Sequence, residues 1–215
     1  MQLSDVEVRI LGCLIEKEAT TPDNYPLSLN ALTNACNQLS NREPVMSLGE
    51  DQVKWAVNSL RQQSLVRAIQ PSDARVMKFQ HLLTEKLDLD QPARAALCVL
   101  MLRGPQTLSE IKTRTNRLAE FTTLADVEAV VTGLIAGGLA VEMARRPGQK
   151  EIRYTHLLSG SPPSEAPAET PLEIAAALAE PRKDRIAELE ASLDEVRREL
   201  AELRERFEEF TKQFS

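Results

Sequence analysis

The sequence predicts a mainly α-helical protein with small β-wings, an α+β fold of two tandem winged helix-turn-helix domains followed by a coiled-coil helix. Three observations predict this fold. An order of three amphipathic helices and a β-hairpin occurs twice, in residues 1–83 and 84–158. A segment rich in Pro, Ser and Ala then predicts a linker at 159–171. Residues 172–215 read as a helix whose apolar residues follow a strict heptad from Ile186.

Local start and stop signals divide the first domain into three helices and two strands. The first helix opens on the capping box Ser4-Asp5-Val6-Glu7 and ends at 20–23. A short helix is expected at 27–37, and Ser47-Leu48-Gly49-Glu50 reads as the capping box of a third helix. One apolar stripe marks the buried face of that third helix: Val53, Ala56, Val57 and Leu60. The expected strands are 65–70 and 76–81, around a turn at 71–74.

The second domain repeats this order. Helices are expected at 92–103, from 107 to about 115, and at 124–137, and strands at 139–144 and 151–156 around a Pro-Gly turn. The two hairpins end alike, since Phe79-Gln80-His81-Leu82-Leu83 corresponds to Tyr154-Thr155-His156-Leu157-Leu158. A shared order of elements with matched endings indicates an internal duplication.

The C-terminal heptad predicts a homodimer. Its apolar positions alternate between three- and four-residue spacing without a slip, and an isolated helix would expose all of them. The alternative is a long helix that folds back onto its own domains. The expected dimer seam consists of Ile186, Leu189, Leu193, Val196, Leu200, Leu203, Phe207, Phe210 and Phe214.

Charge and composition narrow the class of protein. The net charge of −6 arises in residues 159–215, because residues 1–158 hold 18 basic and 18 acidic side chains. A nucleic-acid surface, if present, must therefore be a local basic patch. Three cysteines distant in sequence favour neither a disulfide framework nor a metal site. No apolar run approaches the roughly 20 residues that span a bilayer, and the N-terminus is polar, so we expect a cytoplasmic protein with no membrane partner.

A resemblance to a known family rests on the long segment from Glu16 to Met46. This segment includes Thr21-Pro22-Asp23-Asn24-Tyr25-Pro26-Leu27-Ser28-Leu29 and Ser40-Asn41-Arg42-Glu43-Pro44-Val45. Together with Arg146-Pro147-Gly148 and the run 151–160, it resembles the YceH-like family of uncharacterised bacterial proteins over about residues 1–160. The resemblance implies tandem winged helices. It implies no activity, and it carries no active-site residues over to this chain.

Signals of catalysis are weak. The two histidines, His81 and His156, occupy the same place in the two repeats, which favours a structural role over catalysis. The sequence contains no Gly-x-x-x-x-Gly-Lys phosphate loop and no nucleophile paired in sequence with a base. We therefore expect no enzyme activity, no cofactor and no metal.

The third helix of the first domain is the candidate DNA-reading element. Its outward face combines cations, which can contact phosphate or guanine, with amides, which can pair with adenine. The candidate contacts on this helix and the first wing are Lys54, Trp55, Asn58, Arg61, Gln62, Arg67, Arg75 and Lys78. An ordinary solvated face is the alternative interpretation.

The equivalent helix of the second domain carries Asp126 and Glu128 outward, and these carboxylates would repel phosphate. Any DNA contact of that domain is expected from its wing, at Arg145, Arg146, Lys150 and Arg153. The polar run from Asn30 to Glu43 is expected to form a structural network, with a recognition surface as the alternative.

Two functions follow from these patterns. The favoured one is a dimeric DNA-binding transcriptional regulator that places its first-domain helices in the major groove of double-stranded DNA. The alternative is a non-catalytic protein-interaction adaptor that uses tandem winged helices as an assembly module, which suits a neutral body with an acidic tail.

Overall fold

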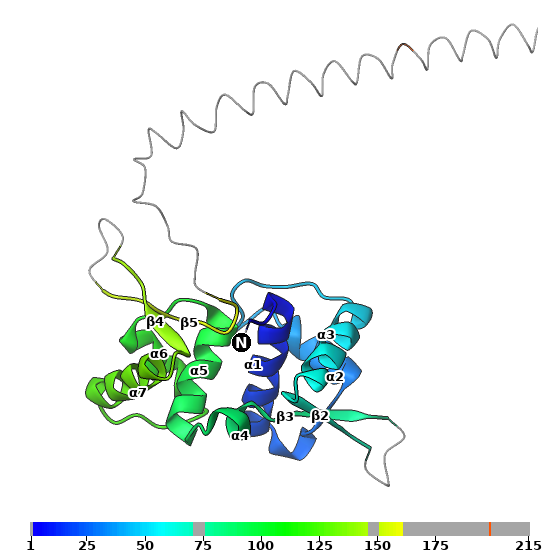
Figure 1. Cartoon of the computed structure of the whole chain (residues 1–215), viewed down its shortest axis with the longest axis horizontal. Helices are drawn as coiled ribbons and strands as arrows, with labels where there is room; N and C mark the ends of the chain where they lie inside the picture. Colours follow the sequence, from blue (N-terminus) through cyan, green and yellow to red (C-terminus); the bar gives the residue numbers. More distant parts are fainter. Residues whose placement is uncertain (1, 71–75, 146–150, 161–197, 199–215) are drawn as a thin grey trace, which may run out of the picture. The chain divides into compact units, whose positions relative to one another are not determined.

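The helices α1 and α5 lie side by side in the middle of the protein, and the other elements pack around them (Figure 1). The computed structural model describes residues 2–70, 76–145 and 151–160, together with Arg198. The linker beyond Gly160, the predicted helix at 172–215 apart from Arg198, and the proposed dimer seam therefore lie outside the described residues, as do both predicted turns.

The first set of elements runs from Ser4 to His81. It comprises α1 (Asp5–Thr20), the 3-10 helix η1 (Pro22–Asn24), β1 (Leu27–Ser28), α2 (Leu29–Cys36), α3 (Glu50–Gln62), β2 (Val66–Ile69) and β3 (Lys78–His81). The capping box at Ser4 and Glu7 is present, as predicted. The three strands form an antiparallel sheet in the order β1-β3-β2, in which Phe79 lies opposite both Leu27 and Ala68.

The short helix α4 (Leu83–Leu87) leads to a second set. This set comprises α5 (Gln91–Arg103), α6 (Leu108–Thr115), α7 (Leu124–Ala136), β4 (Ala140–Glu142) and β5 (Tyr154–His156). The predicted capping box at Thr107 and Glu110 is present. Gln106 and Tyr154 exchange two backbone hydrogen bonds of 2.8 and 2.9 Å, at the place where β1 meets β3 in the first set.

The two sets share details of backbone geometry. Ser64 and Gly138, which follow α3 and α7, both have a positive φ, of 55° and 67°. The next residue in each set donates its N–H back to the helix, Leu65 to the Leu60 carbonyl and Leu139 to the Leu134 carbonyl. Each of these residues then accepts a hydrogen bond from the strand end, from Leu82 and Leu157 respectively. The chain therefore leaves both helices by the same turn.

Three predictions about the elements need correction. The second helix begins at Leu29, because Leu27 and Ser28 pair with β3 as a strand and the Ser28 hydroxyl accepts the Ala31 N–H. The third helix is capped by Gly49, whose N–H donates to the Gln52 side chain, so the capping box predicted at Ser47 is wrong. The helix α4 was not predicted, because five residues are too few to show a helical period.

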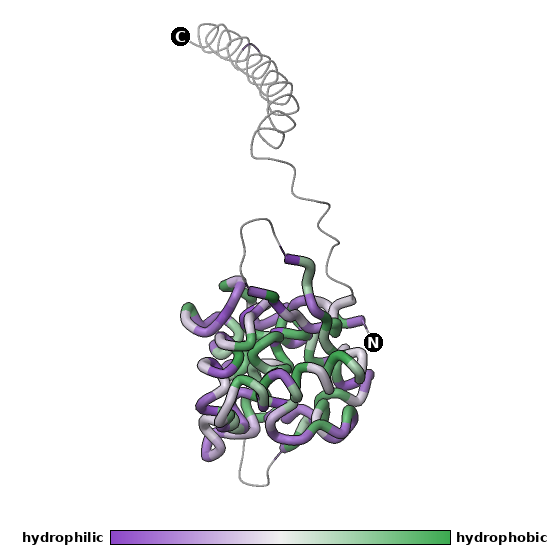
Figure 2. Tube along the Cα trace, turned by 90° about the vertical axis from the view of Figure 1, so that its left-hand side faces the viewer, coloured by the Kyte–Doolittle hydropathy of each residue, from purple (hydrophilic) through white to green (hydrophobic). Residues whose placement is uncertain are grey.

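One hydrophobic core spans both sets, and Figure 2 shows the hydrophobic segments gathered inside the body. The described residues between 2 and 160 accordingly form one compact unit, while the predicted boundary at residue 83 remains a prediction. The chain ends of the unit meet, since the Leu3 N–H donates to the Leu158 carbonyl at 2.7 Å. None of the helices in the described residues is long and apolar enough to cross a membrane.

A glycine allows the close approach of α1 to α5. A Cβ atom at Gly12 would lie 2.8 Å from Leu102 Cδ2 and 2.9 Å from Leu102 Cγ. The Gly12 carbonyl also accepts a hydrogen bond from the Cys98 thiol at 3.4 Å. Any larger residue at position 12 must therefore push α5 or the Leu102 side chain away.

We predict that Gly12→Ala lowers the free energy of unfolding by about 1–3 kcal/mol, because overpacking outweighs the gain in helix propensity. Gly133→Ala is the matched control, since Gly133 also lies inside a helix but a Cβ there would meet nothing within 4 Å. That substitution should raise stability by up to about 1 kcal/mol. Urea denaturation measures the free energy of unfolding of both variants. An equal change in this free energy in the two variants would contradict the proposed packing.

Candidate nucleic-acid interface

The predicted contact residues of α3 lie on its exposed face. Lys54, Asn58, Arg61 and Gln62 are all exposed, and the predicted stripe of Val53, Ala56, Val57 and Leu60 is buried on the opposite side. The Arg61 guanidinium donates a hydrogen bond of 3.2 Å to the Asn58 side-chain oxygen. An amide oxygen has two lone pairs, so this bond leaves Asn58 one acceptor site and both NH₂ donors.

Trp55 is 74 % exposed on the same helix. Most of the indole surface is apolar and is unfavourable in water, so Trp55 is a candidate contact residue. Indole can lie against a sugar or a base face as well as against a protein.

The wing adds two cations on one face of its hairpin. Val66 pairs with His81 and Ala68 with Phe79 on the inward face, which places Arg67 and Lys78 together on the outward face. Arg67 is exposed and Lys78 is half-buried. Arg75, the third predicted wing contact, lies outside the described residues.

The second set presents a different surface. Glu128 of α7 is exposed, and so is Asp126, whose pKa is lowered by the Thr123 N–H and hydroxyl. Of the predicted second-wing contacts, Arg145 is exposed, whereas Arg146 and Lys150 lie outside the described residues. Arg153 donates to the Pro105 carbonyl at 2.8 Å and to Glu110 at 3.0 Å, so its charge is already paired within the second set.

An ion pair between the buried Arg42 and the partly buried Glu16 fixes the loop that leads into α3, and the sequence alone did not reveal it. Arg42 donates to both carboxylate oxygens of Glu16, at 2.6 and 3.1 Å, and to the carbonyls of Ala35 and Asn41. Its fifth N–H donates to the Gln38 side chain at 3.0 Å. Glu16 and Arg42 are 26 residues apart, so no local spacing signals the pair.

Further bonds hold both ends of this loop. The Asn37 side chain donates to the Leu48 carbonyl and accepts the Leu48 N–H, both at 2.8 Å. The buried Arg9 donates to the carbonyls of Cys36 and Pro44. These contacts support the structural network predicted for the polar run between Asn30 and Glu43, and they hold the start of α3 in place.

The two histidines have different surroundings. His81 lies 3.1 Å from Glu18, which also pairs with Arg94 of α5 at 3.0 Å. The Nδ1 atoms of both rings are buried without a hydrogen-bond partner among the described residues, but His156 lacks a carboxylate such as Glu18, and burial lowers its pKa below 6.5. Among the described residues, no cluster of three or more His, Cys, Asp or Glu is placed to hold a metal ion.

Comparisons with known proteins point to one family. Residues 3–149 match the model of the family described as "Protein of unknown function, DUF480". A UPF0502 protein of Pelobacter propionicus is 47 % identical over 222 residues, which cover 100 % of this chain and 99 % of that relative. A UPF0502 protein of Vibrio vulnificus is 47 % identical, over 94 % of this chain and 96 % of that relative. A UPF0502 protein of Herminiimonas arsenicoxydans is 44 % identical, over 96 % of this chain and 88 % of that relative.

The environment of His156 generates a pH prediction. Because its pKa is lowered in the folded state, the unfolded chain takes up a proton first as the pH falls below about 6.5, and stability decreases there. We expect His156→Gln to remove this contribution. When the pH is lowered from 7.5 to 5.5, the melting temperature of the variant should therefore fall less than that of the unaltered protein. Calorimetry at both pH values tests this, and parallel falls in the two proteins would contradict it.

Proposed function

From the premise that this chain belongs to the bacterial family described as DUF480 and UPF0502, we propose that it is a dimeric, non-catalytic regulator that binds double-stranded DNA in the cytoplasm. Its two sets of helices and hairpin are, in this proposal, tandem winged helix-turn-helix domains. The shared turn after α3 and α7, and the matched sheet contacts of Phe79 and Tyr154, support that interpretation.

A contrast between equivalent helices carries the proposal. Aligned on their buried stripes, Lys54, Asn58 and Arg61 of α3 correspond to Glu128, Thr132 and Ile135 of α7. The first trio offers two cations and an amide on one exposed face, at spacings of four and three residues. The second offers a carboxylate, which phosphate repels. In this proposal, α3 alone enters the major groove.

The wing and the C-terminal heptad complete the proposal. Arg67 and Lys78 lie on one face of the β2-β3 hairpin, where they can neutralise phosphates beside the groove. The heptad from Ile186 supports a second copy of the chain, which would present two α3 helices to two half-sites.

Affinity selection from a random duplex library at about 0.1 M salt tests the proposal. We predict that one sequence is enriched. Asn58→Ala should relax this specificity and weaken binding to the enriched sequence by about 1–3 kcal/mol, because a bidentate base contact is lost. Lys78→Ala should instead weaken binding to all sequences alike. It should also reduce the slope of the logarithm of affinity against the logarithm of salt concentration by about one unit.

Thr132→Ala, at the equivalent position of α7, is the matched control and should leave binding unchanged. Light scattering of the same samples should give the mass of a dimer. If no sequence is enriched and bulk DNA shows no salt-dependent retention, the regulator proposal fails.

Trp55 favours a second candidate, the protein-interaction adaptor. An indole that is 74 % exposed on a helix is typical of the anchor residues of protein interfaces. In that case Trp55→Ala abolishes capture of a protein partner, whereas Lys78→Ala leaves the capture intact.

A further inference from the structure

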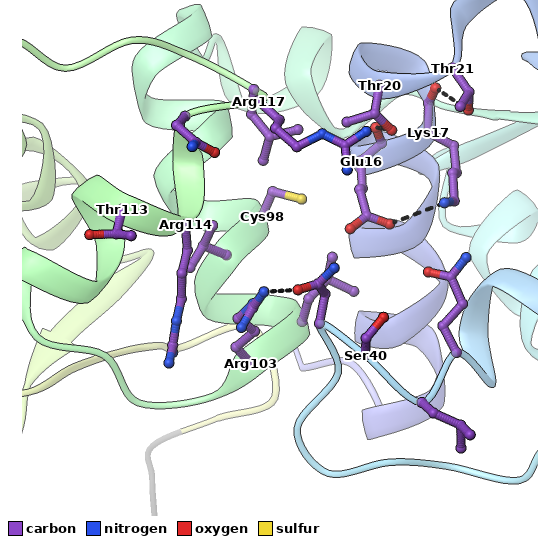
Figure 3. A pocket seen from close by; sticks show the side chains of 17 residues that line it. Glu16, Lys17, Thr20, Thr21, Ser40, Cys98, Arg103, Thr113, Arg114 and Arg117 are labelled. Atoms are coloured by element: carbon purple, nitrogen blue, oxygen red, sulfur yellow. Dashed lines mark hydrogen bonds and ion pairs between the residues drawn. The ribbon is translucent and has the colours of Figure 1, made fainter.

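A cleft opens between the two sets of elements (Figure 3). Its volume is about 730 Å³, and it lies between α1 with the loop at 38–41 on one side and α5 with α6 on the other. A second hollow of about 610 Å³ adjoins it, because Asn41, Arg103 and Arg114 line both. A cleft of this size suits a small molecule.

Positive charge predominates along the two hollows. Three carboxylates, of Glu16, Glu43 and Glu110, face six side-chain cations: Lys17, Arg42, Arg103, Arg114, Arg117 and Arg153. The buried Arg42 already neutralises Glu16. Glu110 is shared between Arg114, at 3.4 Å, and Arg153, at 3.0 Å.

Arg103 and Arg117 are the cations left without a carboxylate partner among the described residues. Arg103 donates to the side-chain oxygen of Asn41, which is neutral. Burial, and then the charge of Arg114, lower the pKa of Arg103, as expected where cations crowd together. Arg117 follows α6 and extends across the opening toward α1 (Figure 3).

The threonine hydroxyls of the cleft are already used within the helices. The hydroxyls of Thr20, Thr21 and Thr113 each donate to the backbone carbonyl four residues earlier. The charged donors of the cleft are guanidinium and ammonium groups, which bind most strongly to an acceptor that carries negative charge, and the amides of Gln38, Asn41 and Asn116 add neutral donors beside them. Val99 and Leu102 provide an apolar wall next to them, suited to the carbon part of a ligand.

We propose that this cleft binds a small organic phosphate, with the phosphate group between Arg103 and Arg117 and the carbon skeleton against Val99 and Leu102. A phosphate monoester carries about −1.5 to −2 charge and three terminal oxygens, and it matches several cations better than a carboxylate does. The guanidinium fork also fits phosphate oxygens in pairs. This site is separate from α3, so it does not rest on the proposed DNA binding.

The test uses the full chain and inorganic phosphate as the probe, in thermal-shift titrations at constant ionic strength with acetate as the carboxylate comparison. Phosphate should raise the melting temperature saturably, and acetate should not. Arg117→Gln should raise the phosphate concentration at half-saturation at least about tenfold, since a charge-assisted contact is lost. Arg117 is exposed and has no ion pair among the described residues, so this variant should fold like the unaltered protein.

Lys86→Gln is the control, because Lys86 is an exposed cation of α4 that lies outside the cleft and outside the proposed DNA-binding surface. It should leave the phosphate titration unchanged. No saturable shift, an equal response to acetate, or an effect of Lys86→Gln without one of Arg117→Gln would each overturn the proposal. If the unaltered protein responds to phosphate but binds no duplex DNA, only the DNA-binding proposal is overturned.

Discussion

The ion pair between the buried Arg42 and Glu16 is the interaction on which the arrangement of both candidate surfaces depends. All five guanidinium N–H groups of Arg42 have acceptors, which offsets the large cost of burying the charge. Although burial opposes it, the bond to Glu16 raises the pKa of Arg42, so the cation persists. The pair ties the loop between α2 and α3 to α1. One end of that loop begins the helix proposed to read DNA, and its middle lines the cleft.

The contact between α1 and α5 is the second constraint. Gly12 lets the helices approach, and a single core then joins both sets of elements. The loop crosses this junction as well, because the Glu43 N–H donates to the Leu102 carbonyl at 2.8 Å and Arg103 donates to Asn41. A ligand held by Arg103 would therefore touch the same loop that leads into α3.

Much of the secondary structure could be predicted because its signals are local. The capping boxes at Ser4 and Thr107 lie within single turns of helix and the stripe from Val53 to Leu60 within about two turns, and each was confirmed. The family resemblance, carried by the segment from Glu16 to Met46, was also confirmed. The strand at Leu27 and the ion pair of Arg42 depend on contacts between residues that are far apart in the sequence. No local sequence pattern therefore predicts them. The cleft depends on the junction of the two sets, which a reading of each set alone does not reveal.

The central claim is that α3, and not its counterpart α7, contacts duplex DNA. Amide hydrogen exchange of the full chain, with and without duplex DNA at about 0.1 M salt, tests this claim most directly. The account predicts that bound DNA slows exchange in peptides that cover 50–62 and the β2-β3 hairpin and leaves peptides that cover 124–136 unchanged. Slower exchange in 124–136 without any change in 50–62, or no change anywhere at saturating DNA, would contradict it.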